Sequence, residues 1–241
     1  MNKISINELT KYFVDKAVLN GLSFNVQPNS STVLLGKSGS GKSTFLRCMA
    51  QLEQPNSGSI FINQQNIATC PDLLKKIGMV FQQLHLWQHM TVLENLILAP
   101  VHVLKLSKAV AIEKAKHLLQ QLDLENKYQK YPKELSLGEQ QRTAIARALM
   151  MDPEILLFDE PTASLDPERS TNIANIIKTL VNKGVTFITA THDINFAKEI
   201  ATQIIFLENG RVLETVPVEN KTISPNTTRF LQFLNTYSTS N

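Results

Sequence analysis

The run Gly36-Lys37-Ser38-Gly39-Ser40-Gly41-Lys42-Ser43-Thr44 fits G-x-x-x-x-G-K-[ST], the pattern of loops that surround the phosphate groups of nucleotides. Residues 32–35 predict a strand before this loop, and residues 45–50 predict a buried helix after it. Glycines allow the tight loop in which successive N–H groups point inward, and the helix N-terminus adds its positive dipole end. In that setting Lys42 reaches the β- and γ-phosphates, and the Ser43 hydroxyl ligates Mg²⁺. The stretch therefore predicts a site for a nucleoside triphosphate.

The composition is that of a globular protein. Of the 241 residues, 43% are hydrophobic and 19% are charged, which permits one large domain or two small ones. A net charge of +3 without a lysine or arginine run does not indicate a nucleic-acid partner. Cys48 and Cys70 form no disulfide framework, which fits a reducing cytosol. No signal-peptide core is present and no apolar run approaches the roughly eighteen residues of a membrane span, so we expect a chain that docks onto a membrane at most.

Strand patterns alternate with helix patterns along most of the chain. Residues 155–158 and 185–190 are apolar runs typical of buried parallel strands, whereas residues 22–26 alternate with period two. The pair Asn209-Gly210 between two apolar runs predicts a hairpin. This order predicts an α/β fold with a parallel sheet covered on both faces, and strand-only stretches near both ends predict an antiparallel part.

Helices are predicted mainly between residues 91 and 150. Ser107 is a candidate cap for one of them, and Pro167 is a candidate first residue of another, which Gly184 ends. Past residue 222 we expect a short helix followed by fraying. The apolar face of the helix after Ser107 comprises Val110, Ala111, Ala115, Leu118, Leu119 and Leu122.

Polar residues at three strand ends are candidates for the chemistry at the phosphate loop. Asp159 and Glu160 close the run at 155–158, where Asp159 would hold Mg²⁺ through water and Glu160 would act as general base. Their alternative role is to cap the following helix. His192 and Gln82 end two further strands, and there they would contact the γ-phosphate and the metal ion, respectively. The sequence thus predicts Glu160, His192 and Gln82 as catalytic, and Ser43, Gln82 and Asp159 as metal ligands.

The segment Leu135-Ser136-Leu137-Gly138-Glu139-Gln140-Gln141-Arg142 resembles L-S-G-G-Q, the signature motif of the ATP-binding-cassette (ABC) ATPases. Four further motifs of that family follow its order and spacing, and the resemblance covers roughly residues 3 to 215. They are the Gln-loop Val80-Phe81-Gln82-Gln83, the Walker B segment at residues 155–162, the D-loop Ala163-Ser164-Leu165-Asp166 and the switch Thr191-His192-Asp193.

The resemblance implies a single ABC ATPase domain over residues 1–241, with a helical subdomain at about 84–150 and a C-terminal tail at about 222–241. It implies that ATP and Mg²⁺ bind between the phosphate loop of one copy and Ser136, Gly138 and Glu139 of a second copy. Phe13 would stack on adenine, with Tyr12 as the alternative and Val18 packing nearby.

Residues 86–95, followed by Ala99-Pro100, resemble the polar-amino-acid importers of bacteria, and the pair Leu86-Trp87 resembles their arginine-type members. That resemblance implies a peripheral subunit at the cytoplasmic face of the inner membrane. It also implies membrane permease subunits and a periplasmic or lipid-anchored substrate-binding protein as partners, and no nucleic acid.

Two residues depart from the signature motif. Leu137 stands in place of a glycine, and Glu139 adds a negative charge where a polyanion is expected. If Leu137 points away from the nucleotide, activity is intact. The alternative is a non-transport or regulatory ABC ATPase with an impaired signature motif.

Overall fold

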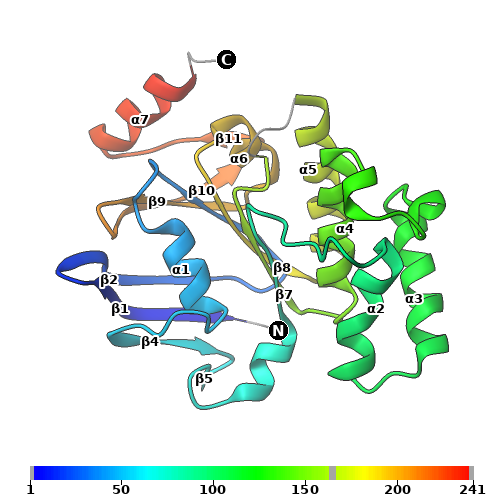
Figure 1. Ribbon diagram of the computed structural model, residues 1–241. Coiled ribbons are helices and arrows are strands. Elements are labelled where there is room, and N and C mark those ends of the chain that lie inside the picture. Colours follow the sequence, from blue (N-terminus) through cyan, green and yellow to red (C-terminus); the bar gives the residue numbers. More distant parts are fainter. Residues whose placement is uncertain (1–2, 163–166, 239–241) are drawn as a thin grey trace.

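The computed structural model describes residues 3–162 and 167–238, and its centre is a seven-stranded sheet (Figure 1). The order is β11-β10-β9-β3-β8-β7-β6, in which β9, β3, β8, β7 and β6 run parallel and β10 and β11 are antiparallel additions. The prediction of a parallel sheet with an antiparallel part is therefore confirmed. The strands are β3 (Ser31–Leu35), β6 (Ile77–Val80), β7 (Ile155–Asp159), β8 (Thr186–Thr191), β9 (Gln203–Glu208), β10 (Arg211–Glu219) and β11 (Thr222–Ile223).

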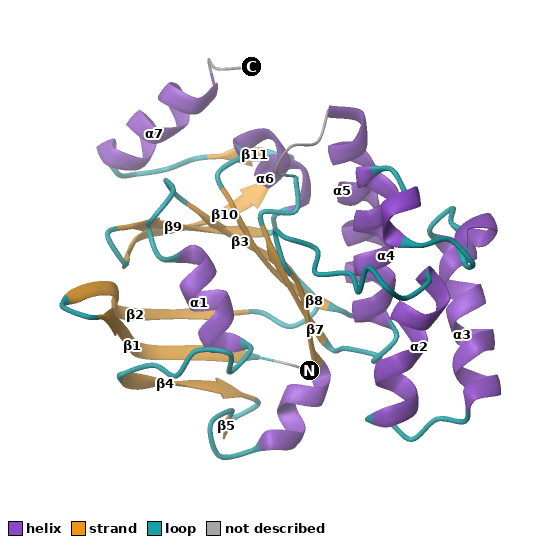
Figure 2. Ribbon diagram, viewed as in Figure 1, coloured by secondary structure: helices purple, strands orange, loops and turns teal. Residues whose placement is uncertain are grey.

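A second, antiparallel sheet of order β2-β1-β4-β5 covers one face of the first, and the helix α1 after the phosphate loop lies between the two sheets (Figure 2). The alternation expected at residues 22–26 is confirmed, because Leu22, Phe24 and Val26 are buried while Ser23 and Asn25 are exposed. The strands of this sheet are β1 (Ile4–Phe13), β2 (Lys16–Val26), β4 (Ser57–Ile62) and β5 (Gln65–Asn66).

Helices cover the opposite face of the seven-stranded sheet. Side chains of α4, α5, α6 and α7 share one apolar core with that face, and α2 and α3 pack on α4 in a core of their own. Figure 1 shows α2 to α5 gathered at the side of the molecule away from the antiparallel sheet. The helices are α1 (Lys42–Met49), α2 (Val92–His102), α3 (Lys108–Gln121), α4 (Leu137–Leu149), α5 (Pro167–Asn182), α6 (Ile194–Ile200) and α7 (Thr228–Ser238), with 3₁₀ turns at η1 (Pro71–Lys76), η2 (Glu125–Lys127) and η3 (Pro132–Glu134).

Helix α3 begins as the sequence predicts. The Ser107 hydroxyl accepts a hydrogen bond from the N–H of Val110 at 3.3 Å, which satisfies one of the free N–H groups of the first turn. Ala111, Ala115 and Leu119 are buried. Assigning Val110 to the same face is wrong, because its side chain is 55% exposed: it lies one position, or about 100°, around the helix from Ala111.

The C-terminal part also follows its local signals. Asn209 and Gly210 have φ values of 50° and 71°, as a two-residue hairpin turn requires, and they join β9 to β10. Helix α5 starts at Pro167 and ends before Gly184, whose φ is 94°. The predicted short terminal helix is confirmed as α7, which packs Phe230 against Phe206.

The predicted D-loop, residues 163–166, lies outside the described residues. Over the ranges that the structure does describe, none of the helices combines the length and the apolar character that crossing a bilayer requires.

Candidate nucleotide-binding site

The phosphate loop joins β3 to α1 and has room only for glycine at two positions. A Cβ atom on Gly36 would lie 2.3 Å from the carbonyl oxygen of Leu207 in β9. Gly41 has a φ of 105°, and a Cβ atom there would lie 2.7 Å from the carbonyl oxygen of Val18 in β2. Because L-residues with side chains neither adopt that φ readily nor tolerate such contacts, the glycines of the motif are required by packing as well as by the loop conformation.

Lys42 is the central cation of the site. Its Nζ donates hydrogen bonds to the carbonyl oxygens of Gly36 at 2.7 Å and Lys37 at 3.2 Å, and lies 3.6 Å from Oε1 of Glu160. The residue is only 5% exposed. Burial lowers the pKa of Lys42, while the nearby carboxylates of Glu160 and Asp159 oppose that shift. The ammonium group thus braces the loop from inside and is positioned to meet phosphate oxygens.

The residues predicted to bind the metal ion lie together. The Ser43 hydroxyl donates to Oδ1 of Asp159 at 2.7 Å, and Ser43 and Gln82 line the same cavity. Hydroxyl, carboxylate and amide oxygens are hard donors that suit Mg²⁺. The described residues contain no cluster of three or more His, Cys, Asp or Glu side chains suited to a metal ion, so a cation here would need phosphate and water oxygens as further ligands. This donor set fits a nucleotide-bound Mg²⁺.

Glu160 and His192, which the sequence predicts to be catalytic, lie in contact with each other. Oε2 of Glu160 lies 2.9 Å from Nδ1 of His192, while the other carboxylate oxygen faces Lys42. Glu160 has a φ of 48°, a left-handed conformation that costs of order 1–3 kcal/mol in a residue with a side chain. The bond from its N–H to the carbonyl oxygen of Ala190 in β8, at 2.9 Å, helps to hold it there. The carboxylate is therefore fixed between a buried cation and an imidazole.

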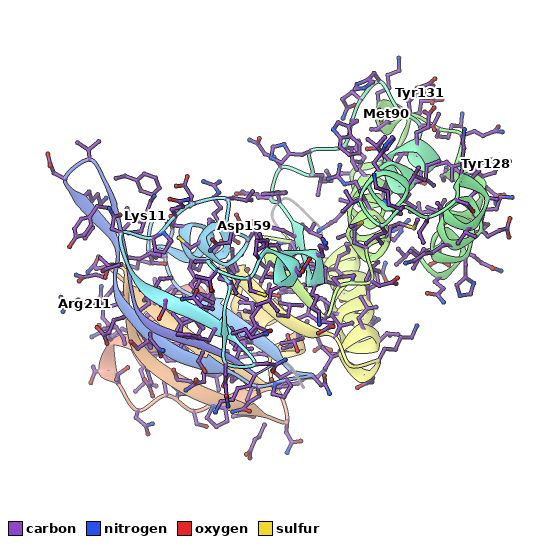
Figure 3. The ribbon with its side chains drawn as sticks, turned by 90° about the horizontal axis from the view of Figure 1, so that it is seen from below. Lys11, Met90, Tyr128, Tyr131, Asp159 and Arg211 are labelled. Carbon is purple, nitrogen blue, oxygen red and sulfur yellow. The ribbon has the colours of Figure 1, made fainter. Side chains whose placement is uncertain are left out.

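These residues surround a cavity of about 410 Å³. Figure 3 shows Asp159 near the middle of the molecule, far from Met90, Tyr128 and Tyr131 at the end of the helical part. The residues that line the cavity come from segments that are distant in sequence. The lining comprises Val18, Lys37, Ser38, Gly39, Gly41, Lys42, Ser43, Thr44, Gln82, Glu160 and His192.

Phe13, the residue predicted to stack on adenine, does not line this cavity. It ends β1, its side chain is 42% exposed, and Nζ of Lys11 lies 5.0 Å from the centroid of its ring. Tyr12, the alternative, does not line it either, whereas Val18 does. The role of Phe13 stays a prediction.

The signature segment begins α4 and contributes nothing to the lining of the cavity. Ser136 caps the helix. Oε2 of Glu139 accepts from the Ser136 N–H at 2.8 Å, and Oε1 lies 3.1 Å from Nζ of Lys127. The hydrogen bond from the Ser136 N–H, and after it the contact with Lys127, hold the pKa of Glu139 below its ordinary value. The Glu139 charge is therefore already compensated within its own chain. Gly138 is buried, whereas Leu137 is 42% exposed.

Two contacts near the site could not be predicted from the sequence, because no motif or periodicity marks their residues. One is the pairing of Lys127 with Glu139. The other is a hydrogen bond from Nε2 of the buried Gln141, in α4, to the carbonyl oxygen of Pro161, directly after Glu160. Both link segments that meet only after folding.

Comparison with known proteins places this site in a family. The ABC transporter family profile matches residues 19–163. The chain belongs to the ABC transporter family, as its ATP-binding cassette, and it is an ATPase. It is similar to the arginine transport ATP-binding protein ArtM of Bacillus subtilis, with 44% identity over 96% of this chain and 98% of that protein.

Two further likenesses agree. The histidine/lysine/arginine/ornithine transport ATP-binding protein HisP of Escherichia coli is 41% identical over 97% of both chains. A dimeric bacterial ABC transporter cassette has a TM-score of 0.82 and 32% identity, covering 90% of this chain and 99% of its own. The same cassette is also known in a post-hydrolysis state bound to ADP and Pi.

Proposed function

We propose that the chain is the ATP-hydrolysing subunit of an importer that moves a polar amino acid across the bacterial inner membrane. The observation that carries the ATPase part is the carboxylate of Glu160, fixed between Lys42 and His192 at the edge of the phosphate loop. The solute class is supported by relatives named for arginine, glutamine and histidine transport, each similar to this chain over at least 90% of its length.

Each polar residue of the site has a distinct role in hydrolysis. Lys42 and the N–H groups of residues 36–44 bind the phosphates, and Glu160 accepts a proton from the attacking water. Nδ1 of His192 contacts the carboxylate of Glu160, so Nε2 is the ring nitrogen that holds the γ-phosphate. Mg²⁺, bound through Ser43, Gln82 and Asp159, would neutralise charge on the phosphate oxygens.

A second copy of the chain would complete the site. The residues lining the cavity come from the phosphate loop, β2 and three strand ends, and none comes from Ser136, Gly138 or Glu139. Those signature residues would instead contact the nucleotide of the partner copy, and the dimeric state of a similar cassette supports such an arrangement. The homodimer would sit at the cytoplasmic face of the inner membrane as a peripheral unit, bound to permease subunits that receive solute from a substrate-binding protein.

The transport function is tested by uptake in the native organism. Uptake of labelled arginine, glutamine and histidine is measured, and deleting the gene should abolish the uptake of at least one of them. The wild-type gene should restore uptake, and a Glu160→Gln version should not. Unchanged uptake of all three would contradict the proposal and would favour the alternative, a non-transport or regulatory ABC ATPase.

The signature position Leu137 distinguishes a working cassette from a regulatory one. Because the side chain is exposed at the first residue of α4, and Ser136 and Gly138 are retained, Leu137→Gly should change the ATPase rate by less than about threefold. Steady-state phosphate release measures this. A gain of more than about tenfold would show that the native signature is impaired.

A further inference from the structure

The turn of the β9–β10 hairpin lies against the phosphate loop, although neither of its residues belongs to the set assigned above. The N–H of Gly210 donates to the carbonyl oxygen of Ser40 at 3.1 Å. The carbonyl oxygen of Gly210 accepts from the N–H of Asn20, in β2, at 2.8 Å. One residue of the turn therefore ties the phosphate loop to the strand that carries Val18.

The junction leaves no room for a side chain at Gly210. A Cβ atom on Gly210 would lie 2.4 Å from the carbonyl oxygen of Val18, and one on Gly41 would lie 2.7 Å from the same atom. Gly210 also has a φ of 71°. Because these contacts are to backbone atoms, no side-chain rotation relieves them: either Val18, which lines the cavity, or the turn itself must move.

The hairpin is held from its outer side by the C-terminal helix. Arg229 of α7 donates from Nε and Nη2 to the carboxylate of Glu208, with distances of 2.6 to 3.0 Å. Beside this pair, the rings of Phe230 and Phe206 stack with centroids 4.4 Å apart. Glu208 is the last residue of β9, directly before the turn, so α7 fixes the strand end from which the turn projects.

We propose that Gly210 is a positioning residue for nucleotide binding. Lacking a side chain, it lets the hairpin turn dock on Val18 and Ser40 and thereby holds the phosphate loop in the shape that accepts phosphates. The proposal rests on nucleotide binding at the phosphate loop and is independent of the dimer and of the transported solute.

The test compares Gly210→Ala with Gly184→Ala in the full chain. Gly184 is a matched control, because its φ of 94° imposes similar backbone strain, while a Cβ atom there meets nothing closer than 3.8 Å. Gly210→Ala should raise the KM for ATP, and the Kd from calorimetric titration with ATP, by about tenfold or more. Its kcat at saturating ATP should stay within about twofold, since Glu160 and His192 are untouched. Gly184→Ala should leave the ATP affinity at the wild-type value.

Equal ATP affinities in the two variants would overturn the proposal, as would a fall in kcat with unchanged KM, which indicates only a loss of folded protein. If Gly210→Ala does not fold, Arg229→Gln replaces it, with Lys221→Gln as the control that removes an ion pair to Glu199 instead. Only Arg229→Gln should raise the KM, by about threefold, and equal KM values would again overturn the proposal. Failure of the wild-type chain to bind ATP would contradict the function itself rather than this role of Gly210.

Discussion

Replacing Glu160 by glutamine is expected to lower the rate of ATP hydrolysis by at least about 100-fold, because an amide cannot accept the proton of the attacking water. The substitution keeps the size of the side chain and removes the charge that faces Lys42 at 3.6 Å. ATP binding should therefore persist, and the variant should accumulate as an ATP-bound dimer. Phosphate release gives the rate, and size-exclusion chromatography with and without ATP gives the dimer fraction.

Glu199→Gln is the control for this experiment. Glu199 also pairs with cations, Lys178 and Lys221, but it does not line the cavity, so hydrolysis should stay near the wild-type rate. If Glu160→Gln hydrolyses ATP as fast as the wild type, Glu160 is not the base.

Replacing Lys42 by alanine should weaken ATP binding by about 100-fold or more, because its ammonium group is a buried positive charge at the cavity expected to hold the phosphates. The change also leaves two loop carbonyl groups, of Gly36 and Lys37, without their donor. The loop should therefore lose its shape as well as its charge. Titration calorimetry with ATP measures the Kd.

An exposed lysine on β2 separates the local effect from a change in net charge. Lys16→Ala removes the same charge outside the cavity lining and should leave the Kd for ATP within about twofold of the wild type. A Lys42→Ala variant that binds ATP as tightly as Lys16→Ala would refute the role of Lys42.

Much of the fold is predictable because its cues are local. The apolar runs of β7 and β8, the Ser107 cap and the Asn209-Gly210 turn each act within a few residues, and each forms the expected element. The face of α3 shows where this reasoning stops. Whether Val110 or Ala111 points inward depends on where α2 and α4 pack, and packing buries Ala111 and exposes Val110.

The site is predictable in part for the same reason. The phosphate loop, Asp159 and Glu160 follow from contiguous motifs, and the structure brings Ser43 within 2.7 Å of Asp159. Gln82 and His192 are predicted from the ends of their strands, and both line the cavity. From the sequence alone, the negative charge of Glu139 is expected to disfavour binding of a polyanion nearby. Lys127, which lies in a different segment of the chain, pairs with Glu139 and compensates that charge.

The sequence by itself determined that residues 36–44 form a phosphate loop between a strand and a helix, because backbone conformation, glycine spacing and helix start are set by neighbours in the chain. Only the tertiary structure decided what surrounds that loop. The carbonyl oxygen of Leu207 lies against Gly36, and that of Val18 lies against Gly41 and Gly210; in each case a strand contacts a loop or turn from another part of the chain. The first depends on β9 lying beside β3 in the seven-stranded sheet, and the others depend on how the two sheets stack, a matter of shape and close packing that no local pattern of residues encodes.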